Sequence, residues 1–130
     1  MDIITTFLDK RDMRQLARSS EIRKVSSAKG AAKALSYFLY EVELGYDPPL
    51  LKVNPENDYL LSVEIGALTR LHINNLISET DFTPEDVLVS SVNRMIYWDH
   101  VEVRESTRIE LEVIILERAR LNEQFRDITD

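Results

Sequence analysis

The chain of 130 residues contains no cysteine, only three glycines and no long apolar segment. Without cysteine it has no disulfide framework, no thiolate nucleophile and no cysteine-based zinc site. Gly30, Gly45 and Gly66 are too far apart to build the glycine-rich loop that holds phosphate in nucleotide-binding proteins. No apolar run approaches the roughly 20 residues that span a bilayer, and the acidic second residue argues against a signal peptide. We therefore expect a cytoplasmic protein that does not bind membranes, or a virion component if a phage encodes it.

Catalytic and metal-binding patterns are missing as well. On a strand, His100 and Glu102 would share a face and both reach one metal, but such a pair is more often a cross-strand charge contact. The adjacent Asp99 and His100 would point to opposite sides of a strand, which does not suit a Ser-His-Asp triad. The second histidine, His72, is interpreted as a structural residue. We expect no catalytic residue, no metal and no cofactor, and thus a protein that is not an enzyme.

One spacing resembles a known family. Arg94 and His100 are separated like the arginine and histidine of the HEPN ribonucleases, which would imply RNA cleavage by these two residues. In that family a polar residue typically follows the arginine, whereas Met95 follows it here. The family is also wholly helical, while strands are expected near His100. A HEPN-like ribonuclease is therefore kept only as a remote alternative.

Charge is distributed very unevenly along the chain. Residues 1–33 carry eight basic and four acidic side chains, a net charge of +4, whereas residues 34–130 carry eight basic and nineteen acidic ones, a net charge of −11. Arg11, Arg14 and Arg18 recur at helical spacing and would line one edge of a helix. A basic arm on an acidic body can attract a second copy head to tail, or bind an acidic partner.

The apolar residues near the N-terminus do not form a single stripe. If residues 1–25 are a helical arm, the apolar side chains of 3–8 and of 13–17 lie on nearly opposite faces. One explanation is a bend near residue 9, with Asp12 capping a second short helix. The alternative is that the two faces dock on different chains.

Two later helices have clear start and stop signals. Ser26 or Ser27 is a suitable N-cap for the first, and Gly45 a suitable stop. Thr83 is a suitable N-cap for the second, with Pro84 at its first position, and this helix is predicted to run to about Trp98.

The segment between these helices is ambiguous. Residues 50–53 and 59–65 are compatible with two strands around a turn, because Leu61, Val63 and Ile65 alternate with polar residues. The same residues also continue a helical stripe, and we favour a helix over residues 58–78.

After the second clear helix the apolar residues no longer recur at helical spacing but alternate with polar ones. Residues 101–104 and 109–115 alternate between apolar and polar side chains around a short polar loop, which predicts an antiparallel hairpin. A last helix is expected over 116–128. The predicted fold is α+β: one mostly helical domain, residues 1–130, with a C-terminal antiparallel β-hairpin packed on helices. Its basic arm spans 1–25 and its acidic body 26–130.

The absence of catalytic patterns and the separation of charge lead to the first hypothesis, a non-enzymatic protein-binding subunit. Such a protein would be a structural or adaptor component of a larger assembly, possibly viral, formed by self-association or with other proteins. We do not expect nucleic acid as the partner, because the acidic body would repel it and no aromatic residue lies among the basic ones to stack on bases. The candidate contact residues are Ile4, Phe7, Leu8, Arg11, Arg14, Arg18, Glu102, Glu110 and Glu112.

The second hypothesis is a small acidic regulator or immunity-type protein. It would cover the basic site of a toxin or nucleic-acid enzyme, with its acids taking the place of phosphates. The acids that would do so are Glu102, Glu105, Glu110, Glu112, Glu117 and Glu123.

Overall fold

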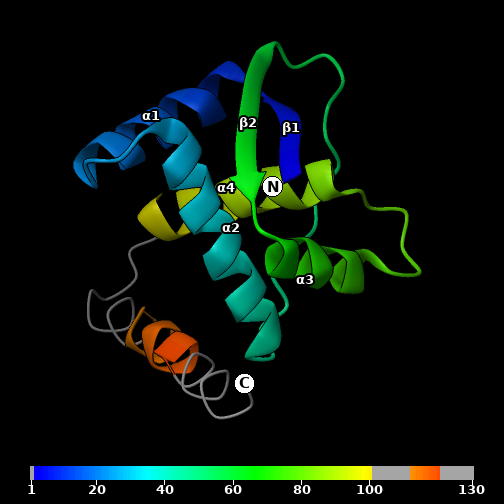
Figure 1. Ribbon diagram of the computed structural model, residues 1–130. Coiled ribbons are helices and arrows are strands. Elements are labelled where there is room, and N and C mark those ends of the chain that lie inside the picture. Colours follow the sequence, from blue (N-terminus) through cyan, green and yellow to red (C-terminus); the bar gives the residue numbers. More distant parts are fainter. Residues whose placement is uncertain (1, 101–111, 121–130) are drawn as a thin grey trace. The chain divides into compact units, whose positions relative to one another are not determined.

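The computed structural model divides the chain into two compact units, Met1–His100 and Val101–Asp130. It describes residues 2–100 of the first unit and 112–120 of the second, and the latter are helical. The elements of the first unit (Figure 1) are β1 (Asp2–Leu8), α1 (Lys10–Ile22), α2 (Ser27–Glu43), β2 (Tyr59–Ile65), α3 (Ala67–Ile77) and α4 (Pro84–His100).

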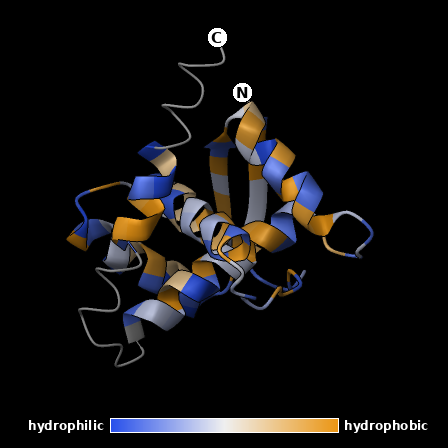
Figure 2. Ribbon diagram, turned by 90° about the horizontal axis from the view of Figure 1, so that it is seen from below, coloured by the Kyte–Doolittle hydropathy of each residue, from blue (hydrophilic) through white to orange (hydrophobic). Residues whose placement is uncertain are grey.

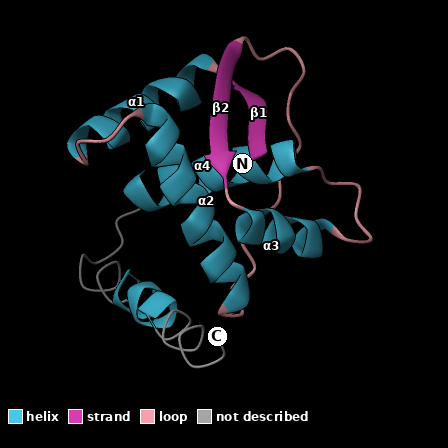
Figure 3. Ribbon diagram, in the orientation of Figure 1, coloured by secondary structure: helices cyan, strands magenta, loops and turns pink. Residues whose placement is uncertain are grey.

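β1 and β2 form a two-stranded antiparallel sheet, although some fifty residues separate them in sequence (Figure 3). The register places Asp2 opposite Ile65 and Leu8 opposite Tyr59. Side chains alternate between buried and exposed along both strands, so that one face of the sheet is buried and the other exposed. Figure 2 shows that apolar residues occur along both strands. The buried face consists of Ile4, Thr6, Leu8, Leu61, Val63 and Ile65.

Helices α2 and α4 cover this buried face. α2 and α4 pack against each other, and of the two strands α2 contacts β2 and α4 contacts β1. α1 contacts both helices. The core between them includes Phe38 of α2, Leu88 of α4 and Leu16 of α1, each at most 1% exposed. Burial of a side chain of this size contributes about 1.5–3 kcal/mol, so the sheet and the three helices are stabilised by one shared core. No helix in the described part of the chain is long and apolar enough to cross a membrane.

The two helices with clear start signals are confirmed. The Ser26 side chain accepts a hydrogen bond from the Lys29 amide at the start of α2 (3.2 Å), and Gly45 follows the helix with a φ of +91°. Thr83 Oγ1 accepts from the Asp86 amide (3.3 Å) at the start of α4, where Pro84 takes the first position.

The predicted N-terminal helical arm is wrong over its first third. Residues 2–8 form β1, and Asp9 rather than Asp12 caps the helix that follows, accepting a hydrogen bond from the Asp12 amide (2.7 Å). The isoleucines and threonines of this segment fit a pleated strand better than a helix. The apolar side chains change face because residues 2–8 follow the two-residue repeat of a strand, whereas residues 10–22 follow the 3.6-residue repeat of a helix.

The helix favoured over residues 58–78 is also only partly right. Residues 59–65 form a strand, as the alternative reading held, and α3 occupies 67–77. Gly66 separates the two elements and caps α3 without a side-chain hydrogen bond. Residues 50–53, the other half of the alternative, are not a strand.

The fold class was wrong in placing the antiparallel pair at the C-terminus. The sheet is β1–β2, and residues 112–120, which include the end of the predicted second hairpin strand, are helical. Four adjacent apolar residues at 113–116 fit an alternating strand poorly, and the glutamates and arginines around them are good helix formers. The first predicted hairpin strand at 101–104, its loop and residues 121–128 of the predicted last helix lie outside the described residues.

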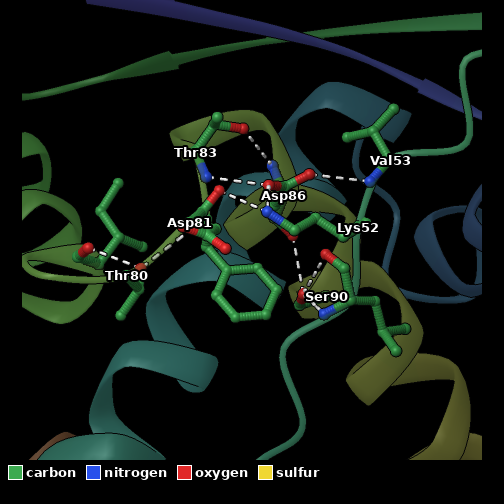
Figure 4. A network of polar contacts seen from close by, with 10 residues as sticks. Lys52, Val53, Thr80, Asp81, Thr83, Asp86 and Ser90 are labelled. Carbon is green, nitrogen blue, oxygen red and sulfur yellow. Dashed lines mark hydrogen bonds and ion pairs between the residues drawn. The ribbon is translucent and has the colours of Figure 1, made fainter.

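The Asp86 carboxylate attaches the α2–β2 connection to the start of α4 (Figure 4). Its two oxygens accept hydrogen bonds from the amides of Val53 (2.8 Å) and Thr83 (2.9 Å). Lys52 Nζ lies 3.7 Å from the same carboxylate, and one turn further along α4 the Ser90 hydroxyl accepts from the Leu51 amide (2.7 Å). Burial by itself raises the pKa of Asp86, but these hydrogen bonds and Lys52 outweigh it and lower that pKa below its usual value.

Replacing this carboxylate predicts a pH-dependent loss of stability. Asp86→Asn should lower the free energy of unfolding at pH 7 by about 1–3 kcal/mol, because the amides lose a charged acceptor. The folded pKa is depressed, so the stabilising effect is present above the unfolded pKa of about 3.9 and is lost as the pH falls through the folded value. Urea denaturation of both proteins at pH 7 and pH 3 measures this, with Asp81→Asn, an exposed neighbouring acid, as control. An equal difference at both pH values would contradict the assignment.

Candidate functional site

A group of basic side chains covers the outer side of α1 and the first half of α2. All of its members are exposed, and none makes an ion pair in the described part of the chain. We call this group the basic surface, and it consists of Lys10, Arg11, Arg14, Arg18, Lys24, Lys29 and Lys33.

The packing of α1 determines which side chains face outward. Leu16 and Ser20 are buried against the rest of the unit. A Cβ atom on Gly30 of α2 would lie only 2.0 Å from the Ser20 hydroxyl oxygen, so the two helices approach closely because position 30 has no side chain. With this side of α1 held against α2, the arginines at i, i+3 and i+7 point away from it.

The remaining cations of the first unit are neutralised. Every described basic side chain between residues 34 and 100 has an acidic partner, and Arg23, at the end of α1, pairs with Asp99 at 3.5 Å. These other partners are Asp86 for Lys52 (3.7 Å), Asp2 for Arg70 (3.1 Å) and Glu41 for Arg94 (2.9 Å). The separation of charge along the sequence therefore persists in space as an unneutralised basic surface.

A second, acidic group lies on the connection between α3 and α4 and in the first turn of α4. Glu79 and Asp81 are exposed and Glu85 is half-buried, and their carboxylates make no ion pair in the described residues. In Figure 1 this connection projects on the side of the first unit away from α1. We call these three residues the acidic loop. The unit thus carries opposite charges at two well-separated places.

An open hollow adjoins the basic surface between the end of α1 and the start of α2. Its lining residues are Ala17, Glu21, Lys24, Val25, Ser26, Ser27 and Lys29. The first turn of α2 opens here, and its amide groups favour negative charge. Two lysines and a helix N-terminus favour negative charge in this hollow, although the carboxylate of Glu21 also lines it.

Asp12 is the one acid in the first turn of α1, and it faces inward. It is half-buried, and its carboxylate accepts a hydrogen bond from the side-chain amide of Asn93, a residue of α4 (3.3 Å). Burial raises its pKa and so does the neighbouring Asp9, against the lowering effect of Asn93 and Arg11. Because Asp12 turns towards α4, it makes no ion pair with the arginines on the outer side.

The contact residues predicted from the sequence fall into three groups. Arg11, Arg14 and Arg18 lie together on the basic surface. Ile4 and Leu8 are only 1% exposed, since β1 turns them into the core, whereas Phe7 is 41% exposed on the opposite face of the sheet. Of the three glutamates, Glu112 is half-buried in the helical segment 112–120, and Glu102 and Glu110 lie outside the described residues.

A buried carboxylate that sequence reasoning missed joins α2 to α4. Glu41, 2% exposed, accepts hydrogen bonds from Arg94 Nε (2.9 Å) and Trp98 Nε1 (2.8 Å). The Arg94 guanidinium also lies 4.9 Å from the ring centres of Tyr97 and Trp98. The sequence signal that could have indicated its burial is its position three residues after Phe38, on the apolar stripe of α2.

These contacts bear on the residues considered for catalysis. Arg94, the arginine of the HEPN-like spacing, is already engaged by Glu41 and two aromatic rings. Asp99 accepts a hydrogen bond from the Ser19 hydroxyl (2.9 Å), and His72 is exposed on α3. Nothing is described for the side chain of His100. Among the described residues no three His, Cys, Asp or Glu side chains lie close enough together to hold a metal ion.

Comparisons with protein-family models, with curated proteins and with solved structures gave no match to this chain.

The Glu41–Arg94 pair predicts a specific pattern of stability. Glu41→Gln should lower the free energy of unfolding by about 3 kcal/mol, because the largely buried Arg94 loses its counter-charge. The double variant Glu41→Gln/Arg94→Met should lose less free energy of unfolding than the sum of the two single variants, since it has no buried charge without a partner. Urea denaturation at pH 7 measures all three variants. The control is Glu43→Gln, an exposed acid two residues further along α2, for which a change within about 0.5 kcal/mol is expected. Strictly additive losses would show that the pair is not coupled.

Proposed function

We propose that this protein is a non-enzymatic assembly subunit that binds copies of itself head to tail, with the basic surface of one copy against the acidic loop of the next. The observation that carries the proposal is the set of seven exposed cations without ion pairs on α1 and α2, in a unit whose other described cations are all neutralised. Unneutralised opposite charges on distant faces attract and orient approaching copies.

The separation of the two charged groups supports a heterologous contact. A surface cannot be its own partner when its members all carry the same charge, so the basic surface requires a different, acidic surface. The acidic loop meets that requirement and faces away from α1 (Figure 1). Contacts of this type form rings if the rotation closes and open filaments if it does not.

The hollow beside the basic surface supports an acidic polypeptide as the ligand. It is lined by Lys24 and Lys29 and by the first turn of α2. A projecting loop with a carboxylate fits such a hollow better than the regular phosphates of a duplex do. The surface also lacks an aromatic side chain among its seven members, which disfavours single-stranded nucleic acid.

Charge reversal on each surface provides the test. At about 50 mM salt, where charges act over more than about 10 Å, the average mass in sedimentation equilibrium should rise with protein concentration, and at about 500 mM salt this rise should disappear. Arg14→Glu/Arg18→Glu lowers the charge of the basic surface from +7 to +3, and Glu79→Lys/Asp81→Lys changes that of the acidic loop from −3 to +1. Each double substitution should therefore weaken the salt-dependent association. Mixing the two variants should strengthen it again, since the two changed surfaces then face each other across one contact and the two unchanged surfaces face each other across the next.

The control for the arginines is Arg14→Lys/Arg18→Lys, which preserves the charge and should preserve the association. Circular dichroism verifies that all variants are folded. Absence of salt-dependent association in the unmodified protein, or failure of the mixture to associate while each variant is folded, would overturn the head-to-tail contact. Binding of a duplex or single-stranded oligonucleotide in preference to a second copy would overturn the choice of partner.

A further inference from the structure

We infer that the free edge of β1 is a second, independent interface, which pairs antiparallel with β1 of another copy to make a four-stranded sheet in the order β2-β1-β1-β2. The contact would be isologous, with its twofold axis at Thr5. It is distinct from the charge-driven contact proposed above and stands on different observations.

The first observation is that both strands have an unused edge. β1 and β2 hydrogen-bond to one another over seven residues each, and no other backbone hydrogen bond to either strand is present among the described residues. An edge strand offers a row of amide and carbonyl groups that another strand can pair with. A two-stranded sheet is marginal by itself, and further strands stabilise it.

The second observation is that β1 lacks the features that protect the edges of monomeric sheets. Residues 3–8 contain no charge, no proline and no glycine, and consist of isoleucine, threonine, phenylalanine and leucine. Their outward-facing members are exposed, with Ile3 at 58% and Phe7 at 41%. β2, in contrast, has a charged residue, Glu64, on the same exposed face.

The third observation is that β1 is self-complementary. Antiparallel pairing about Thr5 places Ile3 of one copy opposite Phe7 of the other, twice, and places the two Thr5 side chains opposite each other. Cross-strand pairs of a β-branched with an aromatic residue are favourable. The same operation on β2, centred on Ser62, would set Leu60 opposite Glu64. The pattern therefore selects β1 and selects a second copy of it as the occupant.

Charge at the ends of the pairing is compatible with this register. Asp2 of one copy, which pairs with Arg70 of its own chain, comes opposite Leu8 of the other, next to the exposed Lys10 and Arg11 that follow it. The twofold axis produces this acid–base approach at both ends. Pairing in the parallel direction would instead place Asp2 beside Asp2.

The residue on the axis gives a sharp test. The substitutions are made in the Arg14→Glu/Arg18→Glu chain, in which the charge-driven contact is weakened, so that this interface and the proposed function can be tested separately. That chain should sediment as a dimer. Thr5→Lys and Thr5→Glu should each weaken the dimer about tenfold or more, because two like charges then face each other across the axis. An equal mixture of the two should recover dimers.

Ser62→Lys is the matched control. Ser62 lies directly opposite Thr5 on β2, and the two hydroxyl groups hydrogen-bond to each other at 2.9 Å. The substitution breaks the same bond, adds the same charge to the same face and lies one strand away from the axis, so the dimer should persist. Equal weakening by Thr5→Lys and Ser62→Lys, or a monomeric parent chain, would overturn the interface.

The absence of cysteine allows a second measurement that does not depend on charge. Thr5→Cys introduces the only thiol, and directly opposed side chains have Cβ atoms about 4.5–5.5 Å apart, close enough for oxidation to an intermolecular disulfide. Mild oxidation should convert this variant to a covalent dimer on a non-reducing gel at least about ten times faster than it converts Ser62→Cys. Equal rates for the two variants would contradict the register.

Discussion

The antiparallel pairing of β1 with β2 is the constraint on which the first unit depends. It closes a loop of about fifty residues, and the entropy of that closure has to be offset by contacts made elsewhere. The offset comes from the buried face of the sheet, where Ile4, Leu8 and Val63 pack on the helices. Because side chains alternate along a strand, the register that buries these residues also exposes Ile3 and Phe7. Both the stability of the unit and the apolar character of its outer sheet face thus follow from one register.

Two buried carboxylates then fix the helices relative to this sheet. Glu41 joins α2 to α4 through Arg94 and Trp98, and Asp86 joins the α2–β2 connection to the start of α4. Each carboxylate pairs with a cation, and Arg70 pairs with Asp2, so the lysine and arginines of 34–100 all take part in internal ion pairs. The cations of 10–33, apart from Arg23, have no such role. The charge available for partners is therefore what remains after the internal ion pairs are made, which the linear sequence shows only in outline.

The sequence predicts the elements whose signals are local and misses those that depend on distant partners. α2 and α4 follow from Ser26, Gly45, Thr83 and Pro84, because caps and stops act within a few residues. β1 was missed because a seven-residue strand needs a partner, and nothing in residues 2–8 shows that it lies at 59–65. The same limit affected residues 112–115, whose alternation is too short to separate strand from helix. Among site residues, Arg11, Arg14 and Arg18 were found by helical spacing alone, whereas the burial of Glu41 depends on α4.

The two proposed contacts have different consequences when they act together. The pairing of two β1 strands is isologous and closes on itself, so by itself it ends at a dimer. The head-to-tail contact is heterologous and leaves one surface free at each end. A dimer held through β1 carries two basic surfaces and two acidic loops, so each dimer would engage neighbours at more than one point. Once one such contact has formed, the second is effectively intramolecular, and weak screened charges then suffice to hold an extended assembly. The salt-sensitive contact would control growth, and the strand pairing would set the repeating unit.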